Sequence, residues 1–211
     1  MIVELHWALG DRDFRLMDME TLWTGLAPVR VGGRVVRTLS REQLAFYLAA
    51  HGTKHAWERL EWILDYGQLV RTSQSLDWSR IALAARRRGF ESALLLALRL
   101  ASDLMGVPVP QALAAQVEGD RRVQDLASRV VASVAATEPF AEQPWSRLRA
   151  FSLSARERWR DRVRYVADLA LTPGSEDWTL LRLPNALYGL YYLLRPIRLA
   201  GKYARRALRM V

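Results

Sequence analysis

The sequence contains no cysteine, which excludes disulfide-stabilised scaffolds, thiolate zinc sites and cysteine nucleophiles. It also lacks an uninterrupted apolar run of the roughly 18 residues that a bilayer-spanning helix needs. Its first residues form neither the basic nor the apolar segment of a signal peptide. Serine, histidine, carboxylate and lysine chemistry remain. The absences predict a cytoplasmic protein, and they leave open whether it lies at the periphery of a membrane.

Acidic side chains are missing from the last part of the chain. The 211 residues include 31 lysines and arginines and 22 aspartates and glutamates, for a formal net charge of +9. Residues 178–211 contain no acidic residue and seven basic ones: Arg182, Arg195, Arg198, Lys202, Arg205, Arg206 and Arg209. The rest of the chain is therefore nearly neutral, and only this segment favours an anionic partner.

Signals for β-strands are confined to the N-terminal part. Residues 2–8 alternate in polarity, which predicts a strand, and residues 29–37 place β-branched side chains around Gly32 and Gly33, which predicts a hairpin. Between them, residues 18–23 predict a short helix with Asp18 as N-cap. A strand that begins at residue 2 needs a partner, so we expect it to pair with another chain or with a missing part of its sheet. The chain is then the later portion of something larger.

Beyond the hairpin the sequence predicts helices, so the expected fold class is mainly α (α+β). Ser40 and Gln43 form a capping box for the first helix, Asp77 is a predicted N-cap, and Gly89 a predicted C-terminal stop. The last helix is expected to be interrupted or kinked near Pro196. The predicted helices span residues 43–51, 56–70, 77–88, 92–105, a short one from 110, 121–136, 145–171, and from 185 into the basic tail. The predicted regions are 1–39 (partial sheet), 40–137 (helical), 138–144 (linker) and 145–211 (C-terminal helices).

The candidate chemistry is densest in residues 51–65, which include two of the three histidines and one of the two lysines. In a continuous helix His51 and His55 would lie one turn apart, close enough to share a metal or a phosphate. Gly52 stands where a zinc-protease motif needs glutamate, so zinc hydrolysis is disfavoured. Three interpretations remain open: a structural helix junction, an anion-binding site, and a metal site, the last including a metallohydrolase built on His6, His51 and His55.

Three other regions contain candidate chemistry. Asp11 and Asp13 have the spacing of a two-metal carboxylate pair, but they follow a glycine in a polar turn and are interpreted as solvated. Glu4 lies mid-strand with His6 on the same face, which suits either an edge charge or a metal ligand. The C-terminal segment alternates aromatic and basic residues, which suits an anionic membrane, a nucleic-acid backbone, or a helix packed on its own domain.

Several segments together resemble a known family. They are VELHW (3–7), the hairpin, LAFYLAAHGTKHAWERLEWILD (44–65), LTPGSEDW (171–178) and LYYLLRPIRL (190–199). They are similar to a bacterial uncharacterised nucleotidyltransferase family of the polymerase-β-like superfamily. The resemblance implies a mixed sheet with a Gly-Ser turn and three carboxylates, followed by a helical half. It also implies Mg²⁺ and a nucleoside triphosphate (NTP), attacked in line at its α-phosphorus.

The resemblance assigns roles residue by residue. Glu4 corresponds to the third, metal-binding carboxylate, and the other implied site residues lie on the family's helical motif: His51, Lys54, His55 and Arg59. The Gly-Ser turn and the first two carboxylates should precede Glu4, and Asp11 and Asp13, which follow it, cannot replace them. We therefore expect the N-terminal strand and hairpin to be a remnant of the sheet and this chain alone to be inactive. A separate N-terminal segment would then be a partner.

Two functional hypotheses follow. The first is a nucleotidyltransferase that transfers a nucleoside monophosphate from an NTP to an unidentified acceptor. The second is a non-catalytic helical module that binds a partner protein, an anionic membrane or RNA through its basic C-terminal helix. The basic residues implicated in that contact are Arg195, Arg198, Lys202, Arg205, Arg206 and Arg209.

Overall fold

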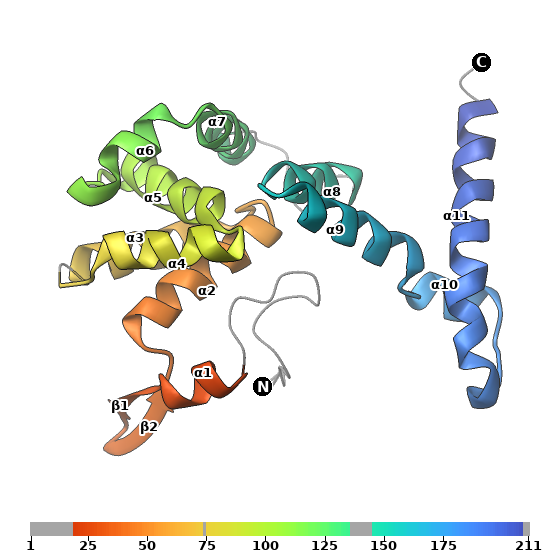
Figure 1. Ribbon diagram of the computed structural model, residues 1–211, viewed down its shortest axis with the longest axis horizontal. Coiled ribbons are helices and arrows are strands. Elements are labelled where there is room, and N and C mark those ends of the chain that lie inside the picture. Colours follow the sequence, from red (N-terminus) through yellow and green to blue (C-terminus); the bar gives the residue numbers. More distant parts are fainter. Residues whose placement is uncertain (1–18, 74, 136–144, 209–211) are drawn as a thin grey trace. The chain divides into compact units, whose positions relative to one another are not determined.

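The computed structural model describes residues 19–73, 75–135 and 145–208 (Figure 1). The chain divides into two compact units, Met1–Asp161 and Arg162–Val211, each described here by itself. Within the described residues the fold is mainly α, with one small antiparallel sheet of two strands near the N-terminus. The predicted fold class is therefore confirmed.

The hairpin consists of strands β1 (Ala27–Val31) and β2 (Arg34–Thr38), paired in the register Val29 to Val36. Gly32 and Gly33 have φ angles of 56° and 79°, the left-handed backbone that a two-residue hairpin turn requires. The predicted hairpin is thus confirmed. The predicted strand at residues 2–8 and the Asp18 cap lie outside the described residues.

Helix α1 (Met19–Thr24) is joined to helix α2 (Arg41–Lys54) by the Gln43 amide, which donates to the carbonyls of Thr21 and Leu22 at 3.3 and 3.2 Å. The same residue completes the predicted capping box, because the Gln43 N–H donates to the Ser40 hydroxyl and the Ser40 N–H donates to the Gln43 side chain. One glutamine therefore begins α2 and anchors the preceding helix to it.

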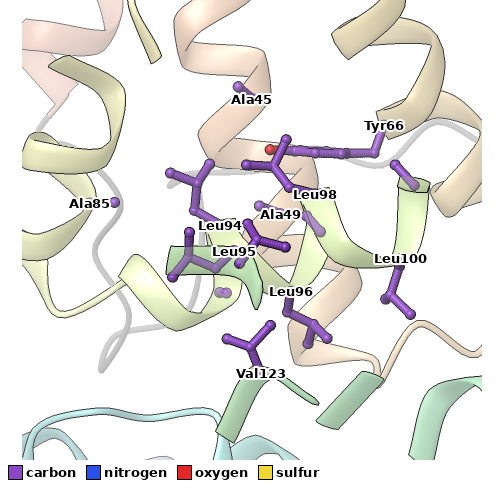
Figure 2. Close-up of a cluster of buried hydrophobic side chains, with 14 of the residues drawn as sticks. Ala45, Ala49, Tyr66, Ala85, Leu94, Leu95, Leu96, Leu98, Leu100 and Val123 are labelled. Carbon is purple, nitrogen blue, oxygen red and sulfur yellow. The ribbon is translucent and has the colours of Figure 1, made fainter. Parts of the chain in front are cut away.

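Helix α5 (Glu91–Met105) is the centre of the first unit. Its leucines, except Leu104 near its end, are buried on all sides, as expected of a helix that is apolar around its circumference. It packs against α2, α3 (Leu60–Thr72), α4 (Trp78–Arg88) and α7 (Arg121–Ala135). Figure 2 shows part of this core, with Leu94, Leu95, Leu96, Leu98 and Leu100 of α5 among Ala49 of α2, Tyr66 of α3 and Val123 of α7.

Local punctuation sets the ends of these helices. The Asp77 side chain accepts from the Arg80 N–H at 2.9 Å, and Gly89 and Gly106 end α4 and α5 in the left-handed conformation with φ of 72° and 62°. The short helices η1 (Gln111–Leu113) and α6 (Ala114–Gly119) then lead to α7. Each of these signals was readable in the sequence, because a cap acts on its own neighbours.

Two predicted helices are wrong. The helix expected at residues 56–70 begins at Leu60, because Ala56 and Trp57 adopt left-handed backbone with φ of 52° and 54°. The helix expected at residues 145–171 is two helices, α8 (Trp145–Ser154) and α9 (Trp159–Leu171).

The break between α8 and α9 has a tertiary cause. The Glu157 carboxylate accepts from the Ser92 N–H in the first turn of α5, and the Arg158 guanidinium donates to the carbonyls of Arg86 and Arg87 at the end of α4, both at 2.8 Å. A carboxylate at a helix N-terminus and a cation at a C-terminus are the favourable arrangement for the helix dipole. Residues 155–158 therefore leave helical geometry, and the capping contacts of Glu157 and Arg158 with two other helices stabilise the break.

The second unit contains the C-terminal part of α9, then α10 (Ser175–Leu180), η3 (Asn185–Leu190) and α11 (Tyr191–Leu208). The predicted interruption at Pro196 is wrong, because α11 runs through this residue. Arg195 and Arg198, on either side of the proline, are held by ion pairs to α10, which offsets the cost of proline in a helix. Within the described residues, no helix is long and apolar enough to cross a membrane.

Candidate functional site: the histidine cluster at the end of helix α2

Helix α2 ends in a tight turn that reverses the chain. The Trp57 N–H donates to the Gly52 carbonyl at 2.7 Å, and the Ala56 N–H donates to the Thr53 carbonyl at 3.2 Å. These two bonds define a Schellman motif, in which the left-handed residue is usually glycine. Here it is Ala56, so a side chain occupies a backbone conformation that costs L-residues about 1–2 kcal/mol.

The indole of Trp57 explains how this turn is held. Its side chain is completely buried, and a methyl group added at Gly52 would lie only 2.6 Å from three of its ring atoms. Tyr66 of α3 meets the indole edge to face, with 6.2 Å between the ring centroids. The missing side chain at residue 52 thus makes room for Trp57, and the buried indole in turn fixes the left-handed turn before α3.

This turn brings four aromatic side chains together, which we call the histidine cluster: Tyr47, His51, His55 and Trp62. The His51 ring centroid lies 4.9 Å from that of His55, 4.9 Å from Trp62 and 5.6 Å from Tyr47. The His55 and Trp62 centroids are 5.4 Å apart. All four side chains are partly exposed, so the imidazoles lie at the surface rather than in the core.

Two cations flank the cluster. The Lys54 side chain is exposed in the last turn of α2, and the Arg59 guanidinium lies 5.9 Å from the Trp62 ring centroid, within range of a cation–π contact. Arg59 also pairs with Glu61 at 2.8 Å, with both side chains more than half exposed. An exposed pair of this kind contributes little to stability, so Arg59 can exchange its carboxylate for another anion at low cost.

The end of α2 is also tied to a distant helix. The Ser152 hydroxyl of α8 donates to the Lys54 carbonyl at 3.2 Å, and Ser152 itself is buried. The Lys54 backbone is thereby fixed, and its side chain is exposed at the surface.

Three buried polar side-chain atoms lie on residues of the turn and on helix α3. Thr53 Oγ1, Trp57 Nε1 and the Tyr66 hydroxyl have no hydrogen-bond partner within the described residues. Burial raises the pKa of the Tyr66 phenol far above its ordinary value, so this hydroxyl stays neutral throughout the physiological range. Buried polar groups without a partner are costly, and these three belong to the turn and to the Tyr66 ring that packs on it.

The structure brings together the sequence-predicted site residues of the segment 51–59. His51, Lys54, His55 and Arg59 lie in or beside the histidine cluster, whereas Glu4, His6, Asp11 and Asp13 lie outside the described residues. Sequence reasoning did not single out Tyr47, although its position one helical turn before His51 was a usable signal. No role for Trp62 in the site was predicted, because its approach to the histidines depends on the turn at Ala56.

Residues 1–106 match the family described as uncharacterised nucleotidyltransferase. The chain belongs to this family. Searches of the curated proteins and of the solved structures found no match. The matched range ends directly after α5, so the nucleotidyltransferase region contains the hairpin, the whole histidine cluster and the central core helix. The second unit lies outside it.

Membership of a nucleotidyltransferase family implies an NTP substrate and a divalent cation. The described residues do not fit the cation: among them, no three histidine, aspartate or glutamate side chains come together as a metal site. Glu4, the predicted ligand, lies outside the described residues.

The second unit contains an ionic cluster of its own. Asp177 is only 5% exposed, and its carboxylate pairs with Arg195 and with Arg198 at 2.6 Å each. Burial alone would raise the pKa of Asp177, but bonds from the Gly174 N–H and the two guanidinium groups outweigh it, so the pKa lies below its ordinary range. Two of the six basic residues predicted to contact an anionic partner are thus engaged within the unit.

Proposed function

We propose that this protein transfers a nucleoside monophosphate from an NTP to an acceptor and that the histidine cluster binds the polyphosphate of the NTP. In this reaction an acceptor oxygen attacks the α-phosphorus, its proton is released, and the bond to the β-phosphate oxygen breaks to give pyrophosphate. The acceptor is unidentified. Family membership supports the reaction class, and the cluster supports the location of the nucleotide.

The observation that carries this proposal is the convergence of two imidazoles and two cations at one exposed helix end. His51 and His55 can donate hydrogen bonds from their ring nitrogens, while Lys54 and Arg59 supply permanent positive charge. Phosphate oxygens are the natural partners of such donors, and Arg59 can bind them with two parallel bonds. A purely structural helix junction would not need both cations at its solvent side.

Calorimetric titration with each Mg-NTP tests this proposal. Lys54→Ala and Arg59→Ala should each weaken NTP binding roughly tenfold, the loss expected for one charge-assisted hydrogen bond. Glu61→Gln should strengthen it, because it removes the carboxylate that competes for Arg59. Arg71→Ala is the control, since it removes an equal charge from an exposed position in the last turn of the same helix α3.

Two outcomes would refute the proposed nucleotide site. Absence of NTP binding by the wild-type protein would refute the proposed site, and so would equal affinities for Lys54→Ala, Arg59→Ala and Arg71→Ala. Glu4→Ala addresses the metal separately: it should reduce the dependence of binding on Mg²⁺ while leaving the effect of Lys54→Ala unchanged. Transfer itself is followed as release of pyrophosphate from the bound NTP.

A further inference from the structure

Helix α11 packs on its own unit through its basic side. Arg195 donates to the Asp177 carboxylate at 2.6 Å and to the Leu169 carbonyl at 3.0 and 3.1 Å, and Arg198 pairs with both Asp177 and Glu176. Tyr191, one turn before Arg195, is buried, and its hydroxyl donates to the Leu181 carbonyl at 2.6 Å. In a soluble amphipathic helix the charged face normally points to water. In α11 the face with Arg195 and Arg198 packs against its own unit instead.

The opposite side of α11 is apolar and uncovered within the described residues. Leu193 is 66% exposed and Ile197 is 69% exposed, and a spacing of four places them on one face of the helix. Arg195 follows Leu193 by two positions, which is a rotation of about 200° around the helix axis. The two side chains therefore lie on nearly opposite sides of α11. The helix thus presents leucine and isoleucine where solvent-facing helices present charge.

Other apolar and aromatic residues of the second unit are exposed as well. The exposed aromatic side chains of this unit are Trp178, Tyr188 and Tyr192. Its other exposed aliphatic side chains are Val163, Val166, Leu171, Leu180, Leu181, Leu187, Leu190 and Leu194. Tyrosine and tryptophan combine an apolar ring with a polar group, which suits the boundary between lipid headgroups and acyl chains.

The charge of this segment identifies the kind of surface that would cover it. Residues 178–211 have seven basic side chains and no acidic one. Arg195 and Arg198 are paired with α10, but Lys202, Arg205 and Arg206 also lie on α11, and the acidic residues of α10 cannot neutralise the whole segment. Apolar area next to unbalanced positive charge complements an anionic lipid surface. RNA would provide the negative charge but no apolar layer for Leu193 and Ile197.

We propose that the second unit attaches the protein peripherally to an anionic membrane, with the Leu193–Ile197 face of α11 inserted at the headgroup boundary. The attachment goes beyond the proposed nucleotidyl transfer and does not depend on it.

Sedimentation with vesicles tests the attachment on the full-length protein. Vesicles that contain phosphatidylglycerol should bind the wild type, binding should decrease at raised salt, and pure phosphatidylcholine vesicles should bind it much less. The double variant Leu193→Glu, Ile197→Glu should lower the bound fraction roughly tenfold or more, because two large apolar side chains no longer enter the lipid. Leu83→Glu is the matched control, a leucine on α4 that is 49% exposed. Both substitutions affect exposed positions, and unchanged helical circular dichroism checks that the fold persists.

Four results would overturn the proposal: no binding of the wild type to anionic vesicles, equal binding of the double variant and Leu83→Glu, binding to both vesicle types without salt dependence, or RNA binding as the only anionic interaction. Sedimentation velocity distinguishes a further alternative. If the wild type forms dimers that the double variant abolishes, and vesicles do not bind, the apolar face is a protein interface instead.

Discussion

Gly52→Ala should destabilise the first unit, although alanine is the better helix former. In an exposed helix interior the substitution would gain about 1 kcal/mol. At Gly52 the new methyl group would lie 2.6 Å from three atoms of the Trp57 indole. The indole is completely buried and its backbone is held in the left-handed turn, so it cannot move aside without disturbing α3.

The magnitude follows from this balance. Forcing an extra methyl group into a well-packed site costs about 1–3 kcal/mol, and a rigid indole puts the cost at the upper end of that range. After the helix-propensity gain, a net loss of about 2 kcal/mol remains. For a unit of this size that loss lowers the melting temperature by about 4–8 °C.

Two other helical glycines serve as controls. At Gly67 the added methyl group meets the flexible Met105 side chain, which can move, so Gly67→Ala should be nearly neutral. At Gly119 nothing lies within 4 Å, so Gly119→Ala should stabilise the protein by about 0.5 kcal/mol. Ala56→Gly should also stabilise it, by up to about 1 kcal/mol, because it removes the side chain from the left-handed position.

Urea unfolding followed by circular dichroism measures all four variants. Equal stability of Gly52→Ala and Gly119→Ala would show that the contact with Trp57 has no energetic effect. A lower stability of Ala56→Gly would show that Ala56 is not strained.

Three further predictions concern single side chains. Asp177→Asn should destabilise the second unit by about 2 kcal/mol, measured as faster amide hydrogen exchange in α10 and α11, because two guanidinium groups lose their carboxylate. Because the pKa of Asp177 is lowered in the folded protein, this contribution to stability is fully present above pH 3.8, the ordinary pKa of the group. It is lost as the pH falls through the lower pKa of the folded state. Protection of the α10 and α11 amides that does not change with acid would contradict this prediction. Burial raises the pKa of Glu157, so stability should decrease as the pH rises above 4.5, the ordinary pKa of the group. Glu157→Gln should remove this pH dependence of stability in urea titrations, while its amide oxygen still accepts from the Ser92 N–H. Ser40→Ala should cost about 1 kcal/mol through loss of the capping box, with Ser79→Ala as an exposed control.

The sequence alone identified the features that act on their own neighbours. The hairpin at Gly32 and Gly33, the capping box at Ser40 and the stop at Gly89 each depend on residues fewer than about six positions apart, so their chemistry is visible in the sequence. The concentration of histidine and lysine in residues 51–55 and the resemblance to a nucleotidyltransferase family were visible in the same way. These signals were sufficient for the fold class and for the candidate region.

Tertiary structure decided what depends on contacts between distant residues. The helix break at residues 155–158 exists because Glu157 and Arg158 cap helices more than sixty positions away, which no local pattern reveals. The start of α3 at Leu60 depends on the Trp57 indole occupying the space left by Gly52, and that contact brings Trp62 against the histidines. The outward apolar face of α11 likewise follows from the pairing of Arg195 and Arg198 with Asp177, because amphipathic periodicity defines two faces of a helix but only packing determines which one is buried.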